Sequence, residues 1–149
     1  MFLINIQLHA EEAGYTNRVK ILSGTSAMAG GASPTGSYIE GIDNSTYSLL
    51  CDLLEITAFG DSYKNRKAGL KDGSVSISGN YDSADTGQGI IVPGASVYIG
   101  VYPSGPSAVG RQAPAICESW ELSADAAGKQ TITASFQFIG APVALPLIT

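Results

Sequence analysis

The sequence has little charge and no long apolar run, and each shortage excludes a class of protein. Only 14% of the 149 residues are charged, and 13 carboxylates against 8 Lys and Arg give a net charge of −5. Proteins that grip nucleic acid neutralise phosphates with clustered cations, so this acidic chain is not expected to bind DNA specifically. Runs of 18 apolar residues do not occur, which argues against a membrane-spanning helix.

Histidine and cysteine are also scarce, which leaves few candidates for catalysis. The one histidine, His9, lies on the polar side of a predicted strand, and Cys51 and Cys117 have no His at zinc-ligand spacing. No cofactor is expected, and an enzyme is the weakest functional class. The start of the chain lacks the basic lead of a signal peptide, which favours a reducing cytoplasm and buried free thiols. The alternative is that the two cysteines meet on adjacent strands and oxidise outside the cell.

Two pairs of carboxylates are spaced three residues apart. Glu118 and Glu121 lie in a predicted strand, where residues i and i+3 point to opposite faces, so they are not expected to act together. Asp82 and Asp85 lack the other ligands of a calcium loop and are expected to bond the backbone of a turn. Asp85 could also cap a helix within 85–92, which the following glycines and proline limit to a turn or two.

Apolar and polar residues alternate with a period of two along most of the chain, which predicts a mainly β protein. We expect residues 1–149 to form one antiparallel β-sandwich or barrel with at most one short helix. A hairpin is predicted over about 2–22, and mobile loops rich in Gly, Ser and Pro over about 23–37 and 102–114. The predicted core residues are Trp120, Leu122 and Phe136. Ile116 is expected to share a strand face with Trp120 and Leu122.

Residues 53–72 combine apolar, aromatic and basic side chains in an unusual way. A strand runs into a loop with two aromatic residues before a second strand begins, and half of the eight cations fall within 64–71. One interpretation is a solvated hairpin tip. The other is an arm that docks on an acidic surface, such as another copy of this chain. The candidate contact residues are Phe59, Asp61, Tyr63, Lys64, Arg66, Lys67, Leu70 and Asp72.

The string EITAFGDSYKNRKAGLKDGSVSISGNYD, residues 55–82, resembles the major tail tube proteins of long-tailed bacteriophages with non-contractile tails. Downstream, ASVYIGVYPSG and CESWELSADAAGKQTITASFQFIGAP follow the same family order of strand, loop, strand, short turn and strand. The resemblance covers about residues 38–142. At 84–94 the family usually carries an alanine-rich helix, whereas this chain has ADTGQGIIVPG, so a shortened or absent helix is expected.

The resemblance implies a structural virion protein whose hexameric rings stack into a tail tube, with strands from every subunit joined in one inner β-barrel that conducts DNA. It implies synthesis in the host bacterial cytoplasm, a place in the virion tail, and partners such as a tape measure and a tail terminator. It also implies that the loop 59–69 packs on an adjacent ring or subunit.

A lumen that neutralised phosphates would hold the genome, so a polar strand face without cations is expected to line the channel. Two faces are candidates. They are either Ser74, Ser76 and Ser78, or Thr131, Thr133, Ser135 and Gln137.

Rival functions stay open at this point. A carbohydrate-binding β-sandwich would share the Gly- and Ser-rich loops and would use exposed tyrosines such as Tyr98 and Tyr102. It predicts a monomer with affinity for sugars, whereas a tube subunit forms rings or tubes and binds no glycan. A tail-completion or head-decoration protein is a closer alternative.

Overall fold

The computed structural model describes residues 17–24, 26–29, 35–103, 105 and 110–145. Within them the chain is mainly β, with one short helix, as the alternation predicted. The elements in chain order are β1 (Arg18–Ser23), β2 (Ser37–Tyr38), β3 (Ile42–Glu55), β4 (Arg66–Asn80), α1 (Thr86–Gly89), β5 (Ser96–Tyr102), β6 (Gly110–Ser123), β7 (Thr131–Phe138) and β8 (Val143–Leu145).

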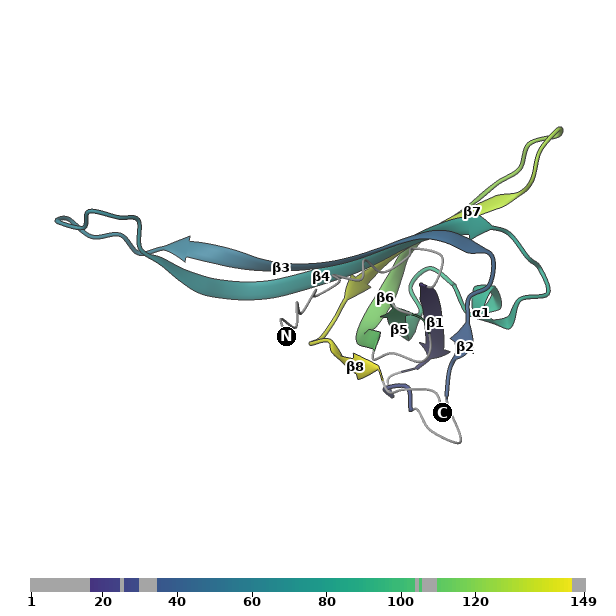
Figure 1. Cartoon of the computed structure of the whole chain (residues 1–149), viewed down its shortest axis with the longest axis horizontal. Coiled ribbons are helices and arrows are strands. Elements are labelled where there is room, and N and C mark those ends of the chain that lie inside the picture. The colour runs from purple at the N-terminus through teal and green to yellow at the C-terminus, as the bar shows by residue number, and fades with distance from the viewer. Residues whose placement is uncertain (1–16, 25, 30–34, 104, 106–109, 146–149) are drawn as a thin grey trace, which may run out of the picture.

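All strands belong to one antiparallel sheet rather than to two separate ones. The order is β2-β1-β5-β6-β7-β4-β3, and β8 pairs with the first residues of β6. The sheet bends over on itself, so that β3, β4 and β7 lie across one side of the core and β1 and β5 lie on the other (Figure 1). The long strand β6 passes between the two sides because it pairs with β5 near its start and with β7 near its end.

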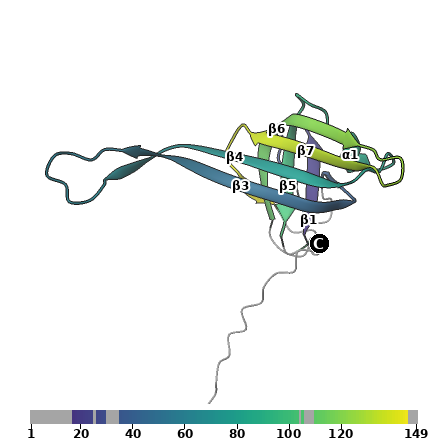
Figure 2. The same cartoon turned by 90° about the horizontal axis from the view of Figure 1, so that it is seen from above.

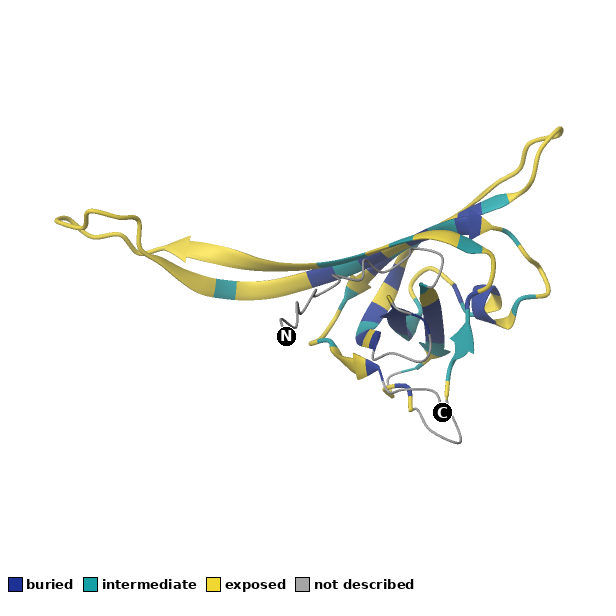
Figure 3. Cartoon of the chain, viewed as in Figure 1, coloured by how far each residue is buried: buried dark blue, intermediate teal, exposed yellow. Residues whose placement is uncertain are grey.

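The core lies in the fold of this sheet and is built from alternate strand residues (Figure 3). Phe136 is completely enclosed, as predicted, and packs in one cluster with residues of five strands. The other fully enclosed members of that cluster are Ile21, Val75, Ile99, Ala115 and Ala134. Burial of these apolar side chains is the main force that holds the sheet bent.

The other two predicted core residues lie nearer the surface. Trp120 is half-buried and packs against the edge of the core, while Leu122 is 42% exposed, so its prediction was wrong. Both face the inner side of the sheet, but Leu122 lies beyond the end of the core. Ile116 does not share their face, because a β-bulge between Cys117 and Ser119 shifts the alternation by one residue.

A second, smaller core covers the opposite face of β5. Tyr102 and Leu145 are buried there with Met28, and the buried amide of Gln112 donates to the Met28 carbonyl oxygen and accepts from its backbone N–H. The expectation of exposed tyrosines was therefore wrong for Tyr102.

The two predicted loops differ from the structure in specific ways. Residues 110–114 begin strand β6 rather than ending a mobile loop, because they pair with β5. In the segment 23–37, residues 25 and 30–34 lie outside the described part, but Met28 is buried. Mobility of this segment stays a prediction.

The predicted N-terminal hairpin can be followed only in its second strand. The strand predicted up to residue 22 is present as β1, and residues 2–16 lie outside the described part. Val19 and Ile21 point into the core, and Lys20 between them is also buried, with its ammonium 5.5 Å from the centre of the Tyr38 ring. Burial lowers the pKa of Lys20.

The strands β3 and β4 continue far beyond the rest of the sheet as a twisted two-stranded arm (Figures 1 and 2). The connecting loop is residues 56–65, shorter than the expected 59–69. Of the predicted contact residues, Arg66 and Lys67 therefore lie in β4 instead of the loop, and Leu70 and Asp72 lie farther along the same strand.

Candidate assembly surfaces

The two candidate lumen faces are one surface. In the register of β4 with β7, Ser74 lies opposite Gln137, Ser76 opposite Ser135 and Ser78 opposite Thr133. Paired residues of an antiparallel sheet project to the same side, so these hydroxyl and amide groups form one continuous polar face. The sequence offered the two sets as alternatives because strand order cannot be read from alternation.

The polar face extends onto both neighbouring strands. From β3 it gains Asn44, Thr46 and Ser48, and from β6 it gains Ser119 and Glu121. None of these strand positions is occupied by Lys or Arg. We call this surface the polar face.

Glu118 joins the polar face through the β-bulge in β6. The Gln137 side-chain amide donates to its carboxylate at 2.9 Å, and Glu121 lies on the same side, opposite Thr133. The expectation that Glu118 and Glu121 point to opposite faces was wrong, because Glu118 is the extra residue of the bulge and lies with Ser119 on the side of Ser135.

Both edges of this part of the sheet are free among the described strands. On one side, β3 pairs with β4 alone. On the other side, β6 bonds the segment before β5 only as far as Cys117. The Cys117 N–H donates to the Ala95 carbonyl, and the Cys117 carbonyl accepts from the Gly94 N–H. Beyond Cys117, β6 pairs with β7 alone. Unpaired strand edges present backbone donors and acceptors to another chain.

The arm exposes an unusual number of large apolar side chains. Phe59 is fully exposed at its tip, Tyr63 is 88% exposed, and Leu53 and Leu54, which alternate between the two faces of β3, are 65% and 57% exposed. The remaining exposed apolar residues of the arm are Leu49, Leu50, Ile56 and Leu70. Soluble monomers rarely expose so much contiguous apolar surface, and an isolated two-stranded ribbon is marginally stable in water.

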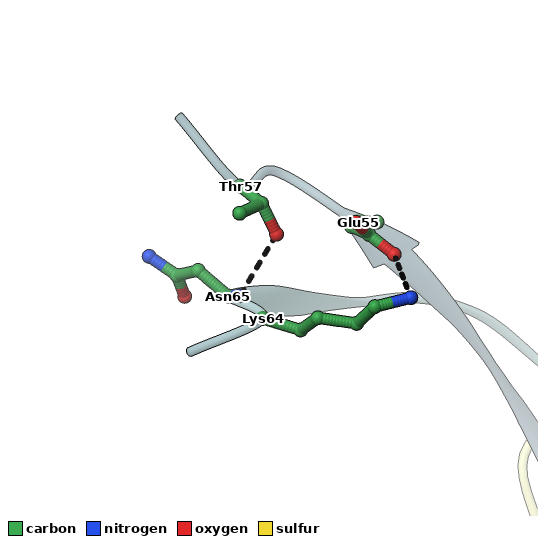
Figure 4. Close-up of polar contacts among 4 residues, drawn as sticks. All are labelled: Glu55, Thr57, Lys64 and Asn65. Atoms are coloured by element: carbon green, nitrogen blue, oxygen red, sulfur yellow. Dashed lines mark hydrogen bonds and ion pairs between the residues drawn. The ribbon is translucent and has the colours of Figure 1, made fainter. Parts of the chain in front are cut away.

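The arm tip is shaped by short-range polar contacts. The Asn65 N–H donates to the Thr57 hydroxyl at 3.0 Å, and the Lys64 ammonium lies 3.4 Å from the Glu55 carboxylate (Figure 4). Asp61 closes the turn by accepting from the Ala58 N–H at 2.9 Å. The neighbouring cations of β4, Arg66 and Lys67, form no ion pair with a described residue, so their charges are available to a partner.

At the other end of the domain, the short helix α1 and the β2–β3 turn are joined by Gln88. Its buried amide donates to the carbonyls of Glu40 and Asn80, both at 2.9 Å, and its oxygen accepts from the Asp82 N–H. Asp85 caps the helix, as predicted, by accepting from the Gln88 N–H at 2.7 Å. Gln88 thereby bonds segments that carry Glu40, Asp82 and Asp85, and Asp43 lies at the start of the adjoining strand β3. We call this end, with its four carboxylates, the acidic end.

The acidic end contains a hollow of about 210 Å³. Trp120 and Tyr81 supply aromatic surface to it, and Asp82 and Asp85 supply negative charge. Among the described residues, no Lys or Arg lines it.

The two cysteines do not pair. Cys51 is exposed on β3 and Cys117 is buried in β6, and these strands are separated by β4 and β7. The expectation of two buried thiols was therefore wrong for Cys51. Burial raises the pKa of the Cys117 thiol.

The described residues contain no group of three His, Cys, Asp or Glu placed to hold a metal ion. Nor do they include a helix of the length and hydropathy needed to cross a bilayer.

No protein-family model and no curated protein matches the sequence. Solved structures do match. A chain from the tail of an empty gene transfer agent particle with C6 symmetry is 19% identical and superposes with a TM-score of 0.70, over 91% of this chain and 100% of that one. The SPP1 tail tube protein gives a TM-score of 0.73 at 14% identity, over 93% of this chain and 81% of that one.

Contractile machines also supply similar structures. A chain of an extracellular contractile injection system, from its sheath and tube terminator, gives a TM-score of 0.61 at 10% identity and covers 93% of this chain and 99% of that one. The described chain therefore has the fold of tail tube proteins, as the resemblance of residues 55–82 predicted.

Proposed function

We propose that this protein is a structural subunit of a phage-type tail, in which hexameric rings stack into a tube that conducts DNA. The observation that carries the proposal is the pair of free edges on β3 and β6 that flank one cation-free polar face. The fold shared with chains from a C6-symmetric tail and from the SPP1 tail tube supports it.

The free edges have the directions that lateral joining requires. The strands β6, β7, β4 and β3 are antiparallel in turn, so β3 of one copy runs antiparallel to β6 of the next. Pairing these edges is a heterologous contact, which closes into a ring when the rotation between copies allows it. It also removes the edge-strand liability of the isolated chain.

The polar face suits the wall of a DNA channel. Its hydroxyl groups, with the carboxylates of Glu118 and Glu121, offer phosphates no cation to bind. DNA carries about one charge per 1.7 Å of its axis, so a wall of this kind repels rather than retains it. A tape measure and a tail terminator are the further partners that we propose for such a tube.

Electron microscopy of the purified chain tests the proposal. We expect rings and tubes with a central hole, whose wall in a reconstruction joins β3 of each copy to β6 of its neighbour. A chain that stays a single domain at every concentration and ionic strength, or a lumen covered by Lys and Arg, would contradict it.

A further inference from the structure

We propose that the arm tip of one copy docks on the acidic end of another, where the hollow beside Trp120 receives a basic side chain of the tip. The inference rests on the proposed function and names the surfaces that couple successive copies along the tube. A head-to-tail contact of this kind is heterologous and propagates without closing.

Charge complementarity identifies the partner. The segment 59–67 carries three cations against the single carboxylate of Asp61. The rest of the chain is strongly acidic, and its acidic end carries four carboxylates, three of them on residues that bond Gln88. Opposed potentials of this kind steer association and fix the orientation of the partners.

The hollow has the chemistry of a site for a guanidinium or an ammonium group. A cation over the face of a tryptophan or tyrosine is attracted by the ring quadrupole, and Asp82 and Asp85 add carboxylates beside Trp120 and Tyr81. Arg66 and Lys67 are the tip cations without an ion pair to a described residue. The exposed rings of Phe59 and Tyr63 lie in the same tip and would add apolar contact.

The two surfaces are placed for head-to-tail contact. The arm tip and the acidic end lie at opposite ends of the long axis of the molecule (Figure 1). One copy therefore cannot dock on itself, and the tip of each copy is directed away from its own acidic end.

Charge reversal tests the contact. One variant carries Arg66→Glu and Lys67→Glu in the tip, and the other carries Glu40→Lys and Asp82→Lys at the acidic end. Asp85 is left unchanged because it caps α1. We expect neither variant to form tubes alone, while a mixture of the two forms tubes, because each mixed contact again joins opposite charges. A chain with all four changes should also assemble.

Controls separate docking from folding. Arg111→Glu reverses an exposed cation of β6 outside the arm and should leave tubes intact. Each reversal variant should unfold at the same urea concentration as the wild type. Trp120 lines the hollow and is the sole tryptophan, so its emission should shift to shorter wavelength when rings stack into tubes, beyond any shift on ring closure.

The outcomes distinguish this inference from the proposed function. If wild-type and reversal variants all form tubes, the tip docks elsewhere and only the present inference fails. The inference also fails if neither reversal variant forms tubes alone and neither their mixture nor the chain with all four changes assembles. A wild type that stays monomeric under all conditions overturns both.

Discussion

At the scale of single residues, Phe136 is the side chain on which the core most depends, because its ring is fully enclosed between strands. Replacement by Ala should lower the free energy of unfolding by about 3–5 kcal/mol, the usual cost of deleting a buried aromatic ring. Leu122→Ala, at a position 42% exposed, should cost less than about 1 kcal/mol. Urea denaturation of the unassembled chain measures both. Equal losses would mean that Leu122 belongs to the core.

A second prediction concerns Gln88, whose side-chain amide bonds three backbone groups of the acidic end. Gln88→Leu leaves those groups without their partner, at about 1–3 kcal/mol for each group that stays buried. We expect a clear loss of stability in urea denaturation. The matched change at exposed Gln137, whose amide bonds only Glu118 among the described residues, should have little effect. Similar losses at the two positions would contradict the role given to Gln88.

The two thiols should differ in reactivity. Cys51 is exposed and Cys117 is buried with a raised pKa, so a maleimide should label one thiol per native chain and two after unfolding. Mass spectrometry of the labelled chain identifies the residue. Rapid modification of Cys117 in the native chain would mean that the strands around it open readily.

At the scale of elements, the β3–β4 arm has apolar residues on both faces, a pattern found in strands that are covered on both sides. Leu53→Asp and Leu54→Asp alter opposite faces. Each should prevent tube formation while changing the stability of the unassembled chain by no more than about 0.5 kcal/mol. Sedimentation and urea denaturation measure the two effects. If only one variant blocks assembly, the arm is covered on a single face.

Features that depend only on residues close together in the sequence could be predicted from it. The alternation of Val75 and Ile77 places them in the core, and Asp85 caps α1 as its side-chain chemistry requires. The glycine at 87 was interpreted only as a limit on helix length. In the structure a Cβ there would collide with the Tyr38 carbonyl oxygen, so Gly87 also allows α1 to approach β2.

Other features depend on contacts between distant segments and could not be predicted from the sequence. The bulge at Glu118 reverses the expected faces of Ile116 and Glu118 relative to Trp120, and it is visible only in the register of β6 with β7. The hollow at the acidic end brings Trp120 beside Asp82, although 37 residues of sequence lie between them. The exposed leucines of the arm have a reason only in an assembly.

At the scale of the whole molecule, the polar face predicts how a tube treats DNA. Ser76→Lys with Thr133→Lys adds two cations to this face, and tubes of this variant should retain DNA in a filter-binding assay at low salt. Wild-type tubes should not. Val92→Lys with Val143→Lys adds the same charge at exposed positions outside the face and serves as the control. Equal retention by both variants would mean that the polar face does not contact DNA.

The number of strands between the two free edges has a consequence for ring size. Each copy contributes four strands, β6, β7, β4 and β3, to the ring. Because four is an even number, β3 of one copy always runs antiparallel to β6 of the next, whatever the number of copies. Strand parity therefore permits rings of any size, and in the proposed tube the curvature of each subunit would set the number of copies. A change that flattens the sheet, such as deletion of the bulged residue Glu118, should broaden the distribution of ring diameters without preventing closure.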